Sequence, residues 1–326
     1  MLPAAAPPRY AGRAMLPALA QALPVFAIIA LGFFAGRANL IAGDQAQALN
    51  RFVFLFAMPA ALFIFAATNP PPGLADLPFT GVYLGVAVGI FFVSLIMART
   101  LFSLSLREAG AHAFGSTLGN AVFLGLPIVL TIEGWGAPYL LLMLCEGIVI
   151  IALGAAFITA PEDGQTGVSL KAGADALRRV ARNPIVLAMI LGFLVAMLRL
   201  PVPEPAENFF RLLGRAAGPA ALFALGVSLA VAPRGPVAER AGRLTAITLM
   251  KLIAMPGLTW LGMILIGATP EQTGAAVLFT SMPTAVAVFV QTAHERVYQN
   301  TIAAAITVTT LLSLLSVTLV LALFNA

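Results

Sequence analysis

Two ionisable side chains stand inside long apolar stretches of this 326-residue sequence, where a charge is costly and usually functional. Lys251 lies eight residues beyond Arg243, and Glu146 lies eight residues beyond Pro138. At about 1.5 Å per helical residue, each is roughly 12 Å from one end of its helix. Lys251 could attract a carboxylate or replace a coupling cation, and Glu146 could carry a proton. Alternatively the two charges pair with each other, or Lys251 extends to the membrane interface.

A second set of candidates lies in two apolar runs that contain a proline. Pro127 and Pro283 each remove a backbone hydrogen bond and clash with the preceding helical turn. In a bilayer the freed carbonyl groups need partners, so such breaks lie inside the protein or beside a water-filled cavity. The half-helix after each proline would direct free N–H groups and a positive dipole end towards the midplane, which suits an anion. A kink used only for packing is the alternative.

Together these features predict a substrate site and a pair of charge-relay residues. Polar or small residues flank both prolines, and the charged residues belong to neighbouring apolar runs. The predicted substrate-binding residues are Gly119, Asn120, Pro127, Ser281, Pro283, Thr284 and Lys251. Glu146 and Lys251 are the predicted coupling or charge-relay residues. Hydroxyl side chains of the last apolar run, among them Thr309 and Ser316, could face this site or bond their own helix.

The composition shows which elements must position these residues. Of the chain, 60% is hydrophobic and 10% charged, whereas a soluble domain has about 25% charged residues. A helix needs roughly 20 apolar residues to cross a bilayer, and the runs lack the alternation of a membrane β-barrel. We therefore predict an all-α membrane protein with ten transmembrane helices and no large soluble domain. The runs fall at about 16–36, 52–68, 79–102, 111–132, 137–160, 183–200, 207–232, 244–268, 273–292 and 300–324.

Metal and cofactor chemistry has no support in the sequence. Cys145 is the single cysteine, and no Cys/His cluster has metal-ligand spacing. A P-loop, an HExxH motif and a nucleophile elbow are all absent, which argues against ATP hydrolysis and against an intramembrane enzyme. The net charge of +5 comes from basic residues in short loops, so it indicates membrane topology and not nucleic-acid binding.

The basic residues also predict an orientation. Arg37, Arg51, Arg99 and Arg107 fall in one set of alternate loops, and the other set is mainly acidic. The positive-inside rule places the basic loops in the cytoplasm, so ten spans leave both termini outside it. Basic residues near the start oppose this rule. We therefore expect residues 1–15 to be a disordered leader or a mis-assigned start.

Two motifs recur at one offset of 160 residues, which indicates a tandem duplication. Leu31-Gly32-Phe33 recurs as Leu191-Gly192-Phe193, and the five residues Pro59–Phe63 recur unchanged as Pro219–Phe223. Five helices is an odd number, so the second copy would enter the membrane from the opposite side. Inverted repeats of this kind are typical of secondary transporters. The predicted units are a repeat at 16–160, a cytoplasmic loop at 161–182 and a second repeat at 183–326.

Several of these segments, in this order, resemble the auxin efflux carrier family, which includes bacterial malonate and malate permeases. They are Pro24–Phe33, Leu49–Pro59, Gly119–Pro127, Pro219–Gly226 and Ser281–Ala285. The resemblance implies two inverted five-helix repeats, with helices 4 and 9 broken at prolines and crossing near the bilayer centre. It also implies that helices 1, 2, 6 and 7 form a scaffold for an elevator-like movement of the others.

The predicted function is therefore secondary active transport of a small organic anion, such as a mono- or dicarboxylate, across the inner cell membrane. Proton or sodium coupling and a homodimer are both compatible with the sequence, and no nucleic acid, metal or cofactor is expected. A passive anion channel is the main alternative, because an inverted repeat does not exclude it, and an intramembrane enzyme is the weaker one.

Overall fold

The computed structural model describes residues 11–69, 73, 76–160, 184–231 and 241–324. The expected leader at 1–15 lies mostly outside these residues. The expected loop at 161–182 and both chain ends lie outside them entirely.

All regular secondary structure in the described residues is helical, which confirms the predicted class. The first half contains α1 (Ala11–Arg37), α2 (Gly43–Phe52), the π-helical turn η1 (Val53–Ala57), α3 (Met58–Thr68), α4 (Leu77–Leu101), α5 (Leu106–Thr117), the π-helical turn η3 (Ala121–Gly125), α6 (Leu126–Val129) and α7 (Gly136–Ile158). The second half contains α9 (Pro184–Met197), α10 (Glu204–Arg215), α11 (Ala217–Val231), α12 (Ala241–Leu249), the π-helical turn η5 (Met250–Ala254), α13 (Met255–Leu265), α14 (Pro270–Thr280), α15 (Val286–His294) and α16 (Gln299–Leu323).

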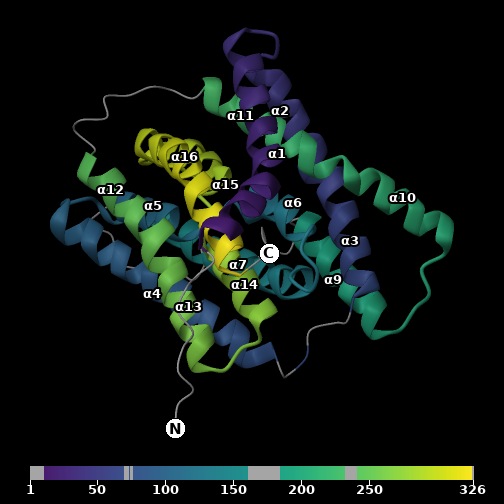
Figure 1. The fold of residues 1–326 in the computed structure, drawn as a ribbon. Coiled ribbons are helices and arrows are strands. Elements are labelled where there is room, and N and C mark those ends of the chain that lie inside the picture. The colour runs from purple at the N-terminus through teal and green to yellow at the C-terminus, as the bar shows by residue number, and fades with distance from the viewer. Residues whose placement is uncertain (1–10, 70–72, 74–75, 161–183, 232–240, 325–326) are drawn as a thin grey trace.

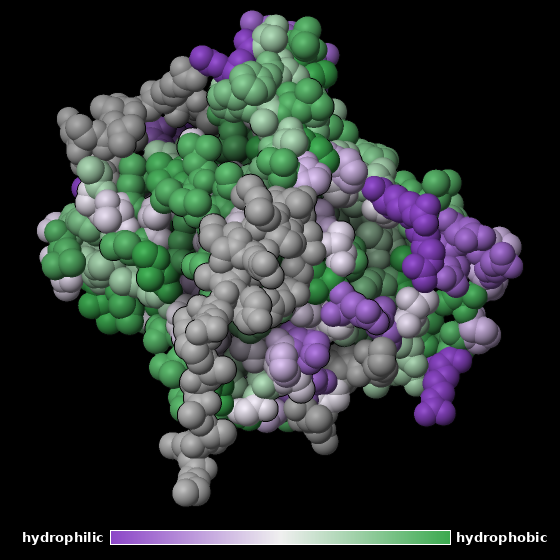
Figure 2. Space-filling view, viewed as in Figure 1, coloured by the Kyte–Doolittle hydropathy of each residue, from purple (hydrophilic) through white to green (hydrophobic). Residues whose placement is uncertain are grey.

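Six continuous helical segments in the described residues are long and apolar enough to cross a membrane. They are Gly43–Thr68, Leu77–Leu101, Gly136–Ile158, Glu204–Val231, Ala241–Leu265 and Gln299–Leu323. Two shorter apolar segments, Phe26–Arg37 and Leu187–Met197, accompany them. Figure 2 shows apolar side chains over much of one face, with hydrophilic ones gathered at the α1–α2 turn and along α10. This distribution fits a protein that is surrounded by lipid.

The second span begins earlier than predicted. The expected run was 52–68, but the helix runs without a break from Gly43 to Thr68. Asp44 lies in its first turn, where an acidic side chain is favoured by the helix dipole. Arg51, which was assigned to a cytoplasmic loop, is therefore part of a helix.

Three prolines sit inside helices without breaking them. Pro59, Pro127 and Pro256 each follow a π-helical turn of five residues and one further residue. At each of these turns, a backbone N–H bonds the carbonyl five residues earlier, as from Leu126 to Ala121. The wider turn removes the clash that a proline causes in an α-helix. The prediction that helix 4 breaks at Pro127 is therefore wrong, because the break lies at residues 118–120.

The helices form two groups, which lie on opposite sides of the molecule in Figure 1. The first bundle comprises α1–α3 and α9–α11, in which α1 packs on α11 and α3 packs on α9 and α10. The second bundle comprises α4–α7 and α12–α16, in which α4 contacts α5, α7 and α13.

The recurring sequence motifs pack against each other reciprocally in the first bundle. A Cβ atom on Gly32 of α1 would collide with the Phe223 carbonyl of α11, and one on Gly192 of α9 would collide with the Phe63 carbonyl of α3. Gly32 and Gly192 are separated by 160 residues, as are Phe63 and Phe223. Each copy of the glycine motif therefore packs on the phenylalanine motif of the other copy. Small residues permit this close approach of membrane helices.

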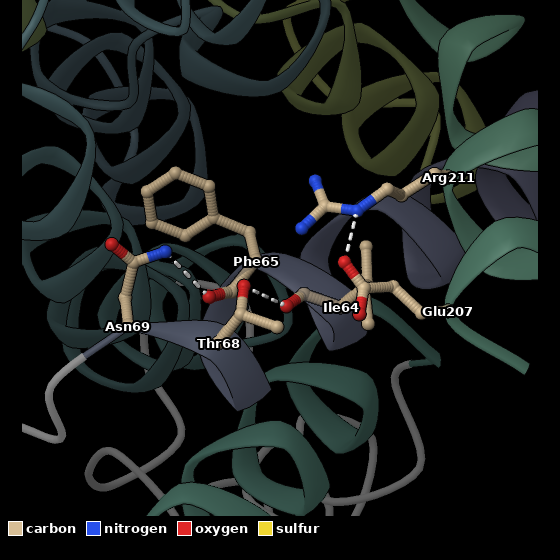
Figure 3. Close-up of polar contacts among 6 residues, drawn as sticks. All are labelled: Ile64, Phe65, Thr68, Asn69, Glu207 and Arg211. Carbon is tan, nitrogen blue, oxygen red and sulfur yellow. Dashed lines mark hydrogen bonds and ion pairs between the residues drawn. The ribbon is translucent and has the colours of Figure 1, made fainter. Parts of the chain in front are cut away.

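Polar side chains form hydrogen bonds with carbonyl groups near the C-terminal end of α3, which packs beside α10 (Figure 3). Asn69 Nδ2 donates a hydrogen bond of 2.8 Å to the Phe65 carbonyl, one of the last four in the helix. Such carbonyls lack a partner within their own helix. Thr68 Oγ1 bonds the Ile64 carbonyl at 2.8 Å, and Arg211 pairs with Glu207 on the neighbouring α10.

The reciprocal contacts predict equal sensitivity at the two glycines. We expect Gly32→Ala and Gly192→Ala each to destabilise the protein by about 1–3 kcal/mol, because an added methyl group would overpack a backbone contact. Thermal unfolding in detergent measures this. Gly81→Ala is the matched control, since no atom lies within 4 Å of its Cβ position. Equal melting temperatures for all three variants would contradict the packing argument.

Candidate functional site

Two interrupted helices cross at their breaks. The first break separates α5 from η3, and the second separates α14 from α15. Gly119 and Thr284 form an isolated antiparallel bridge between them. The Asn120 N–H donates to the Pro283 carbonyl at 2.7 Å, and the Ala285 N–H donates to the Leu118 carbonyl at 3.0 Å. Each broken segment therefore supplies hydrogen-bond partners that the other lacks.

Side chains satisfy most of the remaining backbone groups at the crossing. Glu146 Oε1 accepts a hydrogen bond from the Gly119 N–H at 3.3 Å, and Thr309 Oγ1 accepts one from the Thr284 N–H at 3.1 Å. Lys251 Nζ donates to the Thr280 carbonyl at 3.0 Å, and this carbonyl belongs to the last residue of α14. Unpaired backbone groups are costly in a membrane interior, so these buried polar side chains stabilise the crossing.

Lys251 and Glu146 flank the same short stretch of backbone without forming a direct ion pair. Lys251 is 0% exposed, and its Nζ lies 3.3 Å from the position of a Gly119 Cβ. Among the described residues no ion pair joins it to Glu146, although the two charges interact electrostatically. The cation also lies at the C-terminal end of α14, where the helix dipole is negative. In place of the predicted ion pair, each side chain bonds its own backbone partner: Glu146 bonds the Gly119 N–H, and Lys251 bonds the Thr280 carbonyl.

The N-terminal ends of two half-helices point unpaired N–H groups at this crossing. In η3 the first hydrogen bonds run from Leu124 and Gly125 to the Asn120 carbonyl, so the N–H groups of residues 121–123 precede the first bond. In α15 the Val288 N–H bonds the Ala285 carbonyl, so those of residues 286 and 287 precede it. Free N–H groups and a positive dipole end make a helix N-terminus favourable for an anion.

Both of these N-termini line one cavity of about 670 Å³. It is lined by residues 118–123 from the first break and by residues 285–287 from the second. Its other walls come from α2, η1, α7, α9 and α11, so it lies between the two bundles. A volume of this size is within the usual range for a small-molecule site.

Asn120 adds a side-chain donor to this cavity. The residue is 2% exposed and lines the cavity wall. Its Nδ2 atom is buried and has no hydrogen-bond partner in the described part of the protein. An unsatisfied buried amide is unusual, and a bound ligand is one way to satisfy it. The crossing therefore presents one free amide side chain beside two sets of free backbone amides.

The structure separates the predicted residues into two groups. Gly119, Asn120 and Glu146 line the cavity. Lys251, Ser281, Pro283 and Thr284 are not among the described lining residues. Lys251 Nζ donates to the Thr280 carbonyl, and Thr284 Oγ1 donates to the Gly115 carbonyl. The Ser281 carbonyl accepts from Ser316 Oγ, and the Pro283 carbonyl accepts from the Asn120 N–H. Pro127 lies in α6, seven residues beyond Asn120, and lines a different hollow of about 300 Å³.

Sequence reasoning missed four polar residues on the cavity wall, of which one is Ser228 of α11 and three belong to α2. Gln47, Asn50 and Arg51 of α2 all line the cavity. Their spacing places them on one face of a helix, so the pattern was visible in the sequence. A count of charges along the chain assigns Arg51 to a cytoplasmic loop, and that assignment hides the pattern. Tyr139, whose hydroxyl donates to the Ala121 carbonyl at 3.0 Å, was also missed.

Comparison with known proteins decides the family. Residues 17–321 match the family of membrane transport proteins called Mem_trans. The chain belongs to this family. The resemblance to the auxin efflux carriers is thereby confirmed, and the chain is a multi-span membrane transporter.

Several relatives of this transporter match about nine tenths of its length. A protein named "Putative malonate transporter" from Rhizobium meliloti is 30% identical over 91% of this chain and 92% of its own length. The uncharacterized transporter YfdV of Escherichia coli K12 is 29% identical over 89% of this chain and 92% of its own. An uncharacterized transporter of Methanocaldococcus jannaschii is 24% identical over 91% and 96%, respectively.

The buried charges of the transporter predict a measurable coupling. Lys251→Met should lower the free energy of unfolding by about 3 kcal/mol, because it leaves a buried carboxylate without a compensating charge. Glu146→Gln in the same background should restore part of that loss. The two single variants and the double variant, unfolded in detergent, give an expected coupling of about 0.5–3 kcal/mol. Additive effects would show that the two residues act independently.

Proposed function

We propose that this transporter is a secondary active carrier for a small organic anion, a mono- or dicarboxylate. The observation that carries the proposal is the meeting of two half-helix N-termini in one cavity, beside the unpartnered Asn120 amide. Five backbone N–H groups and one side-chain amide then face a space where a carboxylate fits. The low dielectric of a membrane interior strengthens such hydrogen bonds to a charged ligand.

We also propose ten membrane passes in two inverted five-helix repeats, at 16–160 and 183–326. The six long segments, the two shorter apolar segments and the two interrupted helices supply ten passes. The reciprocal packing of Gly32 on Phe223 and of Gly192 on Phe63 supports the repeat, since a two-fold axis would relate these contacts. Repeats of this kind let a central site face each side of the membrane in turn.

The movement that we propose is a displacement of the second bundle against the first. The cavity lies between the two bundles, and both breaks belong to the second one. The first bundle holds the tight backbone contacts at glycines, which suit a scaffold. An anion held at the crossing would travel with the second bundle, as the resemblance to the family implies for an elevator-type carrier.

The residues take different roles in this proposal. Gly119 and Asn120 contact the anion, together with the free backbone N–H groups of η3 and α15. Glu146, Lys251 and Thr284 are positioning residues, because each bonds backbone at the crossing. Malonate is the first substrate to test, since the relative from Rhizobium meliloti carries that name.

Counterflow in proteoliposomes tests the function. Vesicles loaded with unlabelled malonate should take up labelled malonate transiently and with saturation, because a carrier exchanges bound substrates. Asn120→Ala should raise the half-saturating concentration about tenfold, the size expected for one hydrogen bond to a charged group. Conductance without saturation would indicate a passive channel. A panel of other mono- and dicarboxylates covers the case in which malonate is not bound, and no counterflow with any of them would refute the proposal.

In the same assay, replacing Pro283 by alanine should reduce the counterflow rate more than replacing Pro127 by alanine. Pro283→Ala restores an N–H within the second break and lets α14 continue towards α15, which would pull Thr284 away from its bridge to Gly119. We expect a loss of at least about tenfold in counterflow rate, from the lost geometry of the site. Pro127→Ala is the matched control, because Pro127 lies beyond the break and outside the cavity lining. Equal losses in both variants would contradict this assignment.

A further inference from the structure

We infer that Arg51 recognises a second carboxylate, so that the site selects dicarboxylates over monocarboxylates. This inference rests on the proposed function, because it takes the first carboxylate to bind at the crossing. Arg51 belongs to α2 in the first bundle, whereas the crossing belongs to the second bundle. Both line the same cavity, so one ligand in that cavity contacts groups from both bundles.

The charge of Arg51 is available for a ligand. The side chain is exposed, and no carboxylate among the described residues pairs with it. By contrast, Arg107 is paired with Glu295 and Arg211 is paired with Glu207. A guanidinium group bonds a carboxylate with two parallel N–H donors and stays charged at all physiological pH values. Arg51 is therefore suited to bind an anionic group at a fixed position.

The neighbours of Arg51 in the cavity lining include both polar and apolar side chains. Gln47 and Asn50 lie on the same face of α2 as Arg51, and all three line the cavity. The cavity lining also includes Phe54 and Leu55 of η1, which offer no polar side chain. A ligand in the cavity can therefore place an apolar chain of carbon atoms against these side chains and an anionic group against the polar face of α2.

The charged residues of the cavity wall are consistent with a second carboxylate at Arg51. Glu146 is the other charged residue among the described lining residues, and its carboxylate is engaged with the Gly119 N–H. Lys251, which lies behind the crossing, interacts electrostatically with it. Arg51 is then the one positive side chain that the described lining offers directly to a ligand. A monocarboxylate satisfies the crossing and leaves Arg51 in water, whereas a dicarboxylate of suitable length satisfies both.

Binding measurements with matched acids test this inference. The probes are malonate, succinate and glutarate, each compared with the monocarboxylate of the same carbon number: propionate, butyrate and valerate. We expect the wild-type protein to bind at least one dicarboxylate more tightly than its partner acid, measured by calorimetry in detergent. Arg51→Gln should weaken that dicarboxylate by about 10- to 100-fold, the loss of a charge-assisted hydrogen bond, and leave the monocarboxylate within about twofold.

Two control variants isolate the charge. Arg37→Gln removes an exposed arginine from the last turn of α1, outside the described cavity lining, and should change neither affinity. Arg51→Lys keeps the charge but loses the bidentate geometry, so it should retain part of the preference. All variants should unfold at the wild-type temperature, since both arginines are exposed.

The outcomes separate this inference from the proposed function. If Arg51→Gln behaves like Arg37→Gln, or weakens both acids of a pair equally, the role of Arg51 is refuted while anion binding stands. A wild-type protein that prefers the monocarboxylates refutes it as well. If the wild-type protein binds none of the six acids and shows no counterflow with the wider panel, the proposed function fails and the inference fails with it.

Discussion

The central constraint on this structure is that backbone polar groups inside a membrane need partners. Residues 118–120 and 281–285 leave the helical pattern, and their exposed groups would be prohibitive in lipid. The two segments bond each other at the Gly119–Thr284 bridge, and buried side chains complete the pattern. This requirement explains two costly buried charges, Glu146 and Lys251. It also explains why the two bundles leave a cavity on the side where amides remain free.

Much of this arrangement could be predicted from the sequence, because apolar runs and repeated motifs are visible in it directly. Apolar runs fixed the helical class, and the 160-residue offset pointed to motifs that do pack on each other, as Gly32 and Gly192 show. The position of a helix break was harder to predict. Pro283 lies within a break, whereas Pro127 follows a π-helical turn that accommodates it. Each proline lacks its own backbone N–H, and only the tertiary partners decide whether the helix continues.

The cavity wall was missed for a different reason. A count of basic residues along the chain assigns Arg51 to a cytoplasmic loop. Such a count gives no information about which face of a helix a residue occupies. The structure places Arg51 on α2 with Gln47 and Asn50, facing the same cavity as Asn120. Residues far apart in sequence meet here through the packing of two bundles. Patterns within single helices do not contain that information.

The groups that we propose as the anchor for an anion at the crossing are mainly main-chain amides, and this has a consequence for how the protein can diversify. A main-chain N–H is present whatever the side chain, so a point mutation to any residue other than proline keeps it, and changes in acidity do not titrate it. Selection can therefore remodel the surrounding walls, including α2 and η1, while the anchor for a negative charge persists. Descendants of one ancestor could in this way handle acids of different length and shape with the same central scaffold.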